Sequence, residues 1–379
     1  MVPSFIIVLI VISLLIFVHE LGHFLAAKKA GIKVEEFGFG YPPRLLGKKI
    51  GETIYSINLI PFGGFVRLLG QELSERKKLD KNQAKKAFFS KSKKKRALVL
   101  LAGIIGNLLL GILAFSIIYT KLGIPQKTGQ IKIIEVAENS PAKESGLKSN
   151  DIILSLDGEK VNRVDKFIFL LEEKEVKESE SGNEVLTNEE VVIETEKDFY
   201  VLKPRSNPPE GKGRLGVIVS DTENVFYPWW KMPFLAAFHG TKEALVWSLM
   251  ILQGIFIMFG QLFSGITPQV AGPVGIIQLT SQAAQRGILD LIQFTGILSI
   301  NLAVLNLLPF PALDGGHLVF LFLSRIIKEE KREKIEQKIN LVGFILLLGL
   351  MVLVTIGDFS RIFKEFTPFT FLKGVFKVK

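Results

Sequence analysis

Apolar runs of about 20 residues alternate with polar stretches along the chain. A helix rises ~1.5 Å per residue, so such runs are long enough to cross a hydrocarbon core of ~30 Å. The composition agrees, with 48% hydrophobic residues and a mean hydropathy of +0.35. The pattern therefore predicts a multi-span α-helical membrane protein with four transmembrane helices, at about residues 3–27, 97–119, 296–324 and 339–356.

A fifth apolar run, at 244–263, is not expected to make a simple crossing. If it crossed, the next span would run outward, and the connection from Arg325 to Lys338, with six lysines and arginines, would lie outside. Basic loops tend to stay in the cytoplasm. We therefore predict an interfacial or re-entrant helix at about 232–264, with Trp229, Trp230 and Trp247 suited to a membrane interface.

Charge sets the predicted orientation of the spans. Residues 27–96 contain 18 Lys/Arg and 6 Asp/Glu, a net charge of +12 that exceeds the +10 of the whole chain. Loop 28–96 should therefore be cytoplasmic, with the chain starting outside. A nucleic-acid patch is the other interpretation of the run from Lys91 to Arg96. Its position at a helix end favours an anchor at the lipid bilayer, so we expect no nucleic-acid partner.

Two segments of this loop, 34–40 and 55–66, carry β-branched and aromatic residues between glycines. They predict a membrane-associated β-hairpin region rather than helix. A hairpin that only packs against the protein is one interpretation. The other is that its edge accepts an extended peptide as an added strand, which would make Gly38, Gly40, Gly63 and Gly64 substrate-binding positions.

Residues 127–220 differ in character from the rest of the chain. They contain 14 Lys/Arg and 19 Asp/Glu, with strand-like runs such as 131–136 and 151–156. We predict a soluble α+β domain here, on the extracytoplasmic side by the same orientation. It would divide the membrane core into a first part, 1–126, and a second part, 221–379.

Polar residues interrupt the first apolar run at His19-Glu20-Leu21-Gly22-His23. An ionisable group inside a membrane costs ~2.5 kcal/mol or more, so these residues indicate a functional site. Residues four apart lie on one helix face, so His19 and His23 can aim at one ion, and Glu20 can take a proton from a water there. The pattern arises by accident in soluble helices, where the side chains are solvated, but a membrane span lacks that solvent.

A catalytic zinc site usually has three protein ligands, so a third must come from elsewhere. Two prolines break the helix within the apolar stretch 296–323, and Asp314 follows them. A dication would stabilise its carboxylate. We predict a Zn²⁺ site formed by His19, His23 and Asp314. Asp314 could also cap the helix that follows it. His317 is more consistent with an outer or packing role than with a fourth ligand, which would close the site.

Two asparagines precede this aspartate, and either could hydrogen-bond a substrate backbone or join helices. They are Asn301 and Asn306. The chain contains no cysteine, which excludes disulfides, thiolate zinc ligands and cysteine nucleophiles.

These motifs together resemble the site-2 proteases, which are intramembrane zinc metalloproteases, and specifically the bacterial branch that includes regulators of sigma-E. The resemblance covers nearly the whole chain. Residues 140–158 resemble part of a PDZ domain. The other motifs that carry the resemblance are His19 to His23, Phe37 to Gly40, Pro61 to Gly64, Gly103 to Asn107, and Asn306 to Gly316.

The resemblance implies that His19, His23 and Asp314 bind zinc, that Glu20 is catalytic, and that Asn301 and Asn306 contact substrate. It also implies cleavage of single-span membrane proteins, such as anti-sigma factors or remnant signal peptides, in a bacterial inner membrane after a first cut. The PDZ groove would bind a peptide or protein segment. The chain has one segment that resembles a PDZ domain, whereas the sigma-E branch commonly has two PDZ domains. The resemblance therefore supports the specific substrate of that branch less strongly.

Two functions of other classes remain open on the sequence. An intramembrane metal transporter would need polar groups through the full membrane depth, whereas these cluster at one level. A non-catalytic PDZ receptor would keep residues 127–220 but would not need Glu20 between two histidines.

Overall fold

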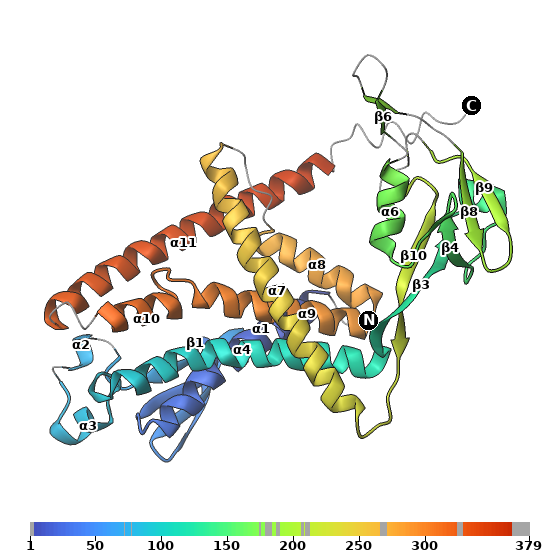
Figure 1. Cartoon of the computed structure of the whole chain (residues 1–379). Coiled ribbons are helices and arrows are strands. Elements are labelled where there is room, and N and C mark those ends of the chain that lie inside the picture. Colours follow the sequence, from blue (N-terminus) through green and yellow to red (C-terminus); the bar gives the residue numbers. More distant parts are fainter. Residues whose placement is uncertain are drawn as a thin grey trace. The chain divides into compact units, whose positions relative to one another are not determined.

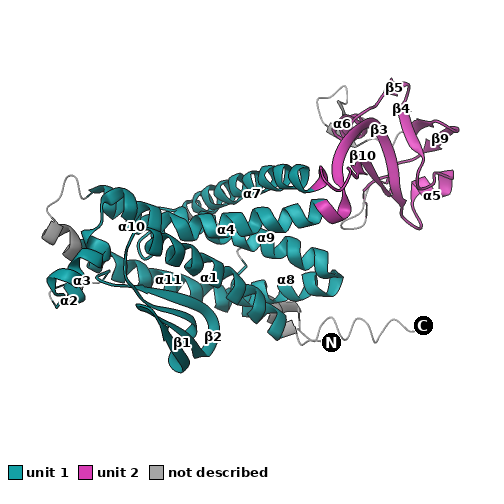
Figure 2. Cartoon of the chain, turned by 90° about the horizontal axis from the view of Figure 1, so that it is seen from below, with its two compact units in different colours: residues 1–119, 233–379 teal, residues 120–232 magenta. Residues whose placement is uncertain are grey.

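The computed structural model divides into two compact units, which are coloured separately in Figure 2. Unit 1 comprises residues 1–119 and 233–379, and unit 2 comprises residues 120–232. Unit 2 contains the whole of the predicted soluble segment 127–220. The structure describes residues 4–71, 73–76, 78–173, 176–178, 184–186, 190–205, 208, 213–265, 271–323 and 329–365.

Unit 1 consists of helices and one β-hairpin. Its long helices are α1 (Ser4–Lys29), α4 (Lys93–Leu122), α7 (Met232–Phe263), α8 (Pro273–Arg286), α9 (Ile288–Leu307), α10 (Asp314–Leu323) and α11 (Glu329–Glu365). Short helices α2 (Leu73–Arg76), α3 (Lys81–Lys86) and η1 (Phe88–Ser90) precede α4. Among the described residues, α1, α4, α7, α9 and α11 are long and apolar enough to span a membrane. The chain is thus a multi-pass membrane protein.

The predicted span at 296–324 is divided in two by the structure. Helix α9 starts earlier, at Ile288, and ends at Leu307, and α10 starts at Asp314. Figure 1 shows α10 beyond the end of α9, in much the same direction. The cause is local, because Pro309 and Pro311 cannot continue a helix. Residue 324 lies outside the described part of the chain.

The segment predicted as interfacial or re-entrant forms one continuous helix, α7. Figure 1 shows that it crosses α4 and α9 at a steep angle. By length and composition it qualifies as a span, one more than the four predicted. Helix α8 was not predicted, although Pro273 in its first turn and Gly287 after its last residue are the usual signals of helix ends.

The predicted hairpin region is larger than expected. Strands β1 (Val34–Ile50) and β2 (Thr53–Leu68) pair along their length. Residues 34–39 lie between two segments of β2, pairing with 64–68 in opposite directions and with 54–57 in the same direction. Residues 44–50 then pair with 53–58, so the two strands form four rows. Residues 64–68 are an edge row, and the hairpin packs on α1.

Unit 2 is built around a six-stranded sheet. The order is β10 (Val217–Val225), β3 (Ile124–Val136), β4 (Ile152–Leu156), β8 (Val191–Thr195) and β9 (Phe199–Leu202), with β5 (Glu159–Lys160) beside β4. Helices α5 (Pro141–Ser145) and α6 (Val164–Glu173) accompany it, and β6 (Val176–Glu178) pairs with β7 (Glu184–Leu186). Its apolar core includes Ile131, Ile133, Ile153 and Phe167.

Candidate metal centre

The candidate site lies where α1 and α4 pack closely against each other. A side chain at Gly22 would overlap the Ala102 carbonyl, and one at Gly106 would come within 2.9 Å of the Val18 carbonyl oxygen. The helix backbones can approach this closely only because glycine has no Cβ. Gly103 lies between these contacts and faces the histidines, where a Cβ would overlap the His23 ring. The imidazoles therefore rest directly on the backbone of α4.

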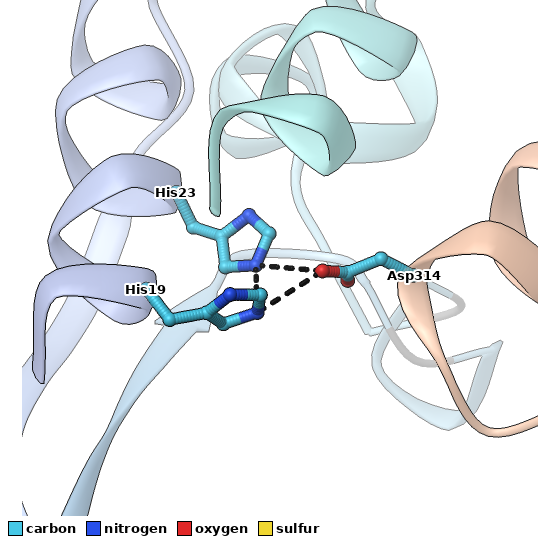
Figure 3. A group of neighbouring side chains, drawn as sticks. All are labelled: His19, His23 and Asp314. Carbon is cyan, nitrogen blue, oxygen red and sulfur yellow. Dashed lines mark hydrogen bonds and ion pairs between the residues drawn. The ribbon is translucent and has the colours of Figure 1, made fainter. Parts of the chain in front are cut away.

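The structure brings the two histidines and the aspartate together, although about 290 residues separate them in sequence (Figure 3). The Nε2 atoms of His19 and His23 lie 3.1 Å apart. The Asp314 Oδ2 atom lies 3.1 Å from Nε2 of His19 and 3.2 Å from Nε2 of His23. His19 and His23 are buried, and Asp314 is nearly so. Three ligand atoms thus converge at one point away from solvent.

This spacing fits a zinc ion. With Zn–N and Zn–O distances of ~2.0–2.1 Å, two ligands of a tetrahedral site stand ~3.3 Å apart. The three separations here, 3.1, 3.1 and 3.2 Å, are close to that value. The buried Oδ2 of Asp314 has no conventional hydrogen-bond donor if both imidazoles are neutral. Such an atom calls for a cation, since an uncompensated buried carboxylate is costly.

Neighbouring groups select the tautomers that a metal needs. His23 Nδ1 lies 2.7 Å from the Val99 carbonyl oxygen. A carbonyl only accepts, so Nδ1 donates the proton, and Nε2 of the neutral ring is free to coordinate. The partner of His19 Nδ1 is the amide of Asn107, a fully buried residue, at 3.4 Å. Turning that amide by 180° places Oδ1, which otherwise has no partner, against the Nδ1 proton.

A compact turn between α9 and α10 delivers Asp314 to the histidines. The Phe310 N–H donates to the Leu308 carbonyl at 2.7 Å, and the Leu313 N–H donates to Phe310 at 3.3 Å. Gly315 and Gly316 follow the aspartate, and a Cβ on either would overlap the carbonyls of this turn. The turn therefore folds over the first residues of α10, which explains the paired glycines.

Glu20 lies between the metal-facing histidines and the β-hairpin. Its Oε2 accepts a hydrogen bond from the Val66 N–H at 3.1 Å. Val66 belongs to the edge row 64–68, so a backbone donor that points away from the sheet holds this carboxylate. Glu20 also lines a cavity of about 300 Å³ with the histidines, Asp314 and other residues, including Tyr41, Gly64, Phe65, Asn306 and Leu313. A carboxylate placed this way can exchange protons with a group bound in the cavity.

The predicted substrate-binding residues divide into two groups. Asn306 and Gly64 line the cavity. Asn301, five positions before Asn306 on α9, is not among the described residues lining it, and five residues rotate a helix by about 140°.

The other three glycines are explained by packing or backbone geometry. A Cβ at Gly38 would overlap the Phe65 ring, and one at Gly63 would lie 2.8 Å from an Ile16 methyl carbon. Gly40 has a φ of +77°, a conformation that favours glycine. Their substrate contacts stay a prediction.

A second cavity of about 450 Å³ adjoins the first along the edge row. Phe65, Val66 and Leu68 line both cavities. His317 lines the second one only, and its Nδ1 lies 3.1 Å from the Glu336 Oε1 on α11. His317 is not part of the group of three converging ligand atoms, and its outer or packing role stays a prediction.

Sequence reasoning did not assign three partners of the site, although it expected Asn107 to need a hydrogen-bond partner. The Val99 carbonyl and the Val66 N–H are backbone groups, so no side-chain pattern could point to them. Asn107 carried a signal, because a lone amide in an apolar helix needs a hydrogen-bond partner. Its position relative to His19 became evident only from the crossing of α1 and α4.

The chain is similar in sequence to known proteins of one peptidase family. Residues 7–350 match the family model described as Peptidase family M50. A Clostridium perfringens protein, provisionally named a zinc metalloprotease, is 37% identical over 356 residues, which cover 92% of this chain and 96% of that protein.

Two further relatives carry more specific names. The regulator of sigma-W protease RasP of Bacillus subtilis is 28% identical over 431 residues, covering 94% of this chain and 98% of the relative. The zinc metalloprotease RasP of Oceanobacillus iheyensis is 27% identical over 435 residues, with the same coverage of both chains.

Proposed function

Because the chain belongs to peptidase family M50 and is an intramembrane zinc metalloprotease of the site-2 type, we propose that His19, His23 and Asp314 hold the zinc ion and that Glu20 is the catalytic base. The observation that carries this assignment is the convergence of three ligand atoms, 3.1–3.2 Å from one another. A metal transporter or a non-catalytic receptor is accordingly not the function of this chain.

A zinc ion held by His19, His23 and Asp314 would supply Lewis acidity, for polarising a scissile carbonyl and for making a water molecule more acidic. Glu20 accepts a proton from the attacking water and passes it to the leaving amide nitrogen. The Val66 N–H fixes the carboxylate for both transfers. His23 and His19 are oriented by Val99 and Asn107, which keeps their Nε2 atoms directed at the ion.

Substitution of Glu20 tests this assignment. Glu20→Gln should retain one zinc per chain and lose cleavage of a single-span test substrate in proteoliposomes. Asp314→Asn should lose both zinc and cleavage. Cleavage by Glu20→Gln at the wild-type rate would contradict the role of the glutamate, and full zinc content in Asp314→Asn would contradict the ligand set.

The substrate is inferred to be a single-span membrane protein bound in extended form. A transmembrane helix hides its peptide groups in its own hydrogen bonds, so it must unwind before cleavage. The edge row 64–68 borders the cavity next to Glu20, where strand addition would place an unwound segment at the metal. Anti-sigma factors and remnant signal peptides are the candidate substrates, and the name of the Bacillus subtilis relative favours a regulatory one.

We also propose that the chain lies in a bacterial inner membrane with four crossings and with unit 2 outside. The support is in the helix contacts. Ser299 of α9 donates to the Asn107 carbonyl of α4, and Gly296 packs on Ala114, so α9 runs antiparallel to α4. Tyr119, near the end of α4, donates to Glu243 in the first half of α7. Helices α7 and α9 therefore begin on the side where α4 ends, which leaves no net crossing for 232–287.

Unit 2 is proposed to be a PDZ domain that binds a peptide or protein segment. Strand β10 is at one edge of the sheet, and α6 contacts it. An edge strand beside a helix is the arrangement that accepts a peptide by strand addition. Ile218 on β10 is largely exposed and is available to a ligand.

Ile218→Asp should weaken the binding of peptides that end at the site of the first cut. Fluorescence polarisation on the full chain measures this binding, and equal binding by wild type and variant would contradict the proposal.

A further inference from the structure

Helix α11 touches the turn that carries Asp314 through one of its faces. Three of its residues make the contacts: Glu336, Asn340 and Gly343. They are spaced by four and three positions, so they lie on the same side of the helix. Their partners are all between residues 311 and 317, on either side of the aspartate.

The central contact holds the backbone in an unusual conformation. Ala312, two residues before Asp314, has a φ of +69°. A residue with a Cβ keeps this left-handed conformation only where its surroundings impose it. The Oδ1 atom of Asn340 accepts a hydrogen bond from the Ala312 N–H at 3.1 Å. The amide therefore fixes the peptide group that sets the direction of the chain into the aspartate.

The other two contacts hold the turn on both sides of this bond. A Cβ at Gly343 would overlap the Pro311 ring, so the turn packs directly on the backbone of α11. On the far side, Glu336 pairs with His317 of α10 at 3.1 Å. The turn is thus held on both sides, with Asn340 at the centre.

We propose that Asn340 is a positioning residue for the zinc centre, which acts by holding Ala312 in its left-handed conformation so that the Asp314 carboxylate meets the two histidines. This inference rests on the ligand set proposed above. Helix α11 supplies none of the three proposed ligands, but through Asn340 it determines where Asp314 lies. Asn340 does not contact the metal in this role.

Zinc affinity is the direct test. Asn340→Leu keeps the branching at Cγ but replaces the acceptor oxygen by a methyl group, and Asn340→Asp keeps an acceptor oxygen. We expect Asn340→Leu to bind zinc about tenfold more weakly than wild type, the lower range for outer partners of metal ligands, and Asn340→Asp to stay within about threefold. The measurement is competition of the purified full chain with a chelator of known zinc affinity.

A second variant separates positioning from general damage. Glycine adopts positive φ without steric cost, so Ala312→Gly should restore most of the affinity lost in Asn340→Leu. Excess zinc should restore cleavage by Asn340→Leu, because the catalytic groups are intact. Wild-type affinity in Asn340→Leu, or failure of both rescues, would overturn the proposal.

Asp358 provides a matched control on the same helix. Its carboxylate is buried and accepts from the N–H groups of Gly272 and Gly275, which joins α11 to α8. It lies 18 residues from Asn340, about 27 Å along the helix. Asp358→Asn weakens this joint without touching the turn and should leave zinc affinity unchanged. An equal loss in both variants would show that loosening of α11 is the cause and would overturn the specific role of Asn340.

Asp314→Asn, measured in parallel, distinguishes failure of the ligand set from failure of the role of Asn340. If it binds zinc as wild type does, the ligand set itself is wrong. If it loses zinc while Asn340→Leu does not, the ligand set stands and only the role of Asn340 fails.

Discussion

Gly103 shows how the absence of a side chain makes the metal centre possible. Its Cα faces both imidazoles, and a Cβ there would overlap His23 and lie 2.8 Å from His19 Cε1. A carbon at that distance must displace a ring or the helix. The glycine is therefore a requirement of the site and not only of helix packing.

Gly103→Ala should accordingly lower zinc affinity by at least about tenfold, comparable to the loss of an outer partner. Gly349→Ala is the matched control, because a Cβ at Gly349 meets nothing within 4 Å. Both zinc contents can be measured on purified chains after dialysis against a weak chelator. Equal retention of zinc would show that the two imidazoles do not need their present position against α4.

Asn107 is the second residue whose substitution should change the metal centre. Asn107→Leu removes the partner of His19 Nδ1, so we expect a 10- to 100-fold loss of zinc affinity. Asn107→Asp offers an acceptor to the same nitrogen and should lose less. A competition titration ranks the three proteins, and a leucine variant that equals wild type would disprove the partnership.

At the scale of elements, the edge row 64–68 connects the hairpin with catalysis. Its Val66 N–H points to Glu20 instead of to a neighbouring strand. Proline is tolerated on an edge strand where the lost donor faces outward. The row can therefore lose this donor and still remain part of the sheet.

We predict that Val66→Pro retains zinc but cleaves at least about 10-fold more slowly, because the base loses its positioning donor. Val66→Ala keeps the N–H and serves as the control. Single-turnover cleavage in proteoliposomes gives both rates. If Val66→Pro cleaved as fast as Val66→Ala, the backbone donor would have no part in the reaction.

Sequence reasoning predicted helices and helix ends correctly where a single residue type determines them. Apolar runs located α1, α4 and α11, and the prolines explained the break between α9 and α10. It underestimated the size of the hairpin, because its four rows depend on pairing along both edges of residues 34–39. It missed α8 because a short helix of mixed polarity carries no long apolar signal.

The family assignment from the sequence is confirmed. Local helix geometry places the two histidines of the site, whereas tertiary contacts place the aspartate. A helical spacing of four places His19 and His23 together without knowledge of the fold. The meeting with Asp314 depends on a left-handed alanine and three contacts from α11, none of which a sequence pattern encodes. Tertiary packing, not local propensity, completes the site.

In the whole molecule, a fall in pH should lower the stability of unit 2 through protonation of Asp151. Burial alone would raise the pKa of this carboxyl, but hydrogen bonds from Lys197 and the Lys148 N–H outweigh burial and hold its pKa below the usual value. The fold therefore favours the charged form. That stabilisation is fully present above the unfolded pKa of ~3.9 and is lost as pH falls through the lower folded value.

Asp151→Asn should reduce the stability of unit 2 by ~1–2 kcal/mol at pH 6, since it removes hydrogen bonds to a buried charge. The difference from wild type should shrink below about pH 4. Pulse proteolysis of the full chain in urea, with pepsin at the acidic points, follows this change. A difference that stays constant down to pH 2.5 would contradict the linkage.

The coordination of zinc in the Glu20→Gln protein shows whether His19, His23 and Asp314 bind one ion together. X-ray absorption at the zinc edge should give two imidazole nitrogens and one carboxylate oxygen at ~2.0–2.2 Å, with one further light ligand. Asp314→Asn should lose the metal. An unchanged spectrum and zinc content in Asp314→Asn would show that the carboxylate at the start of α10 is not a ligand and that the proposed zinc site is wrong.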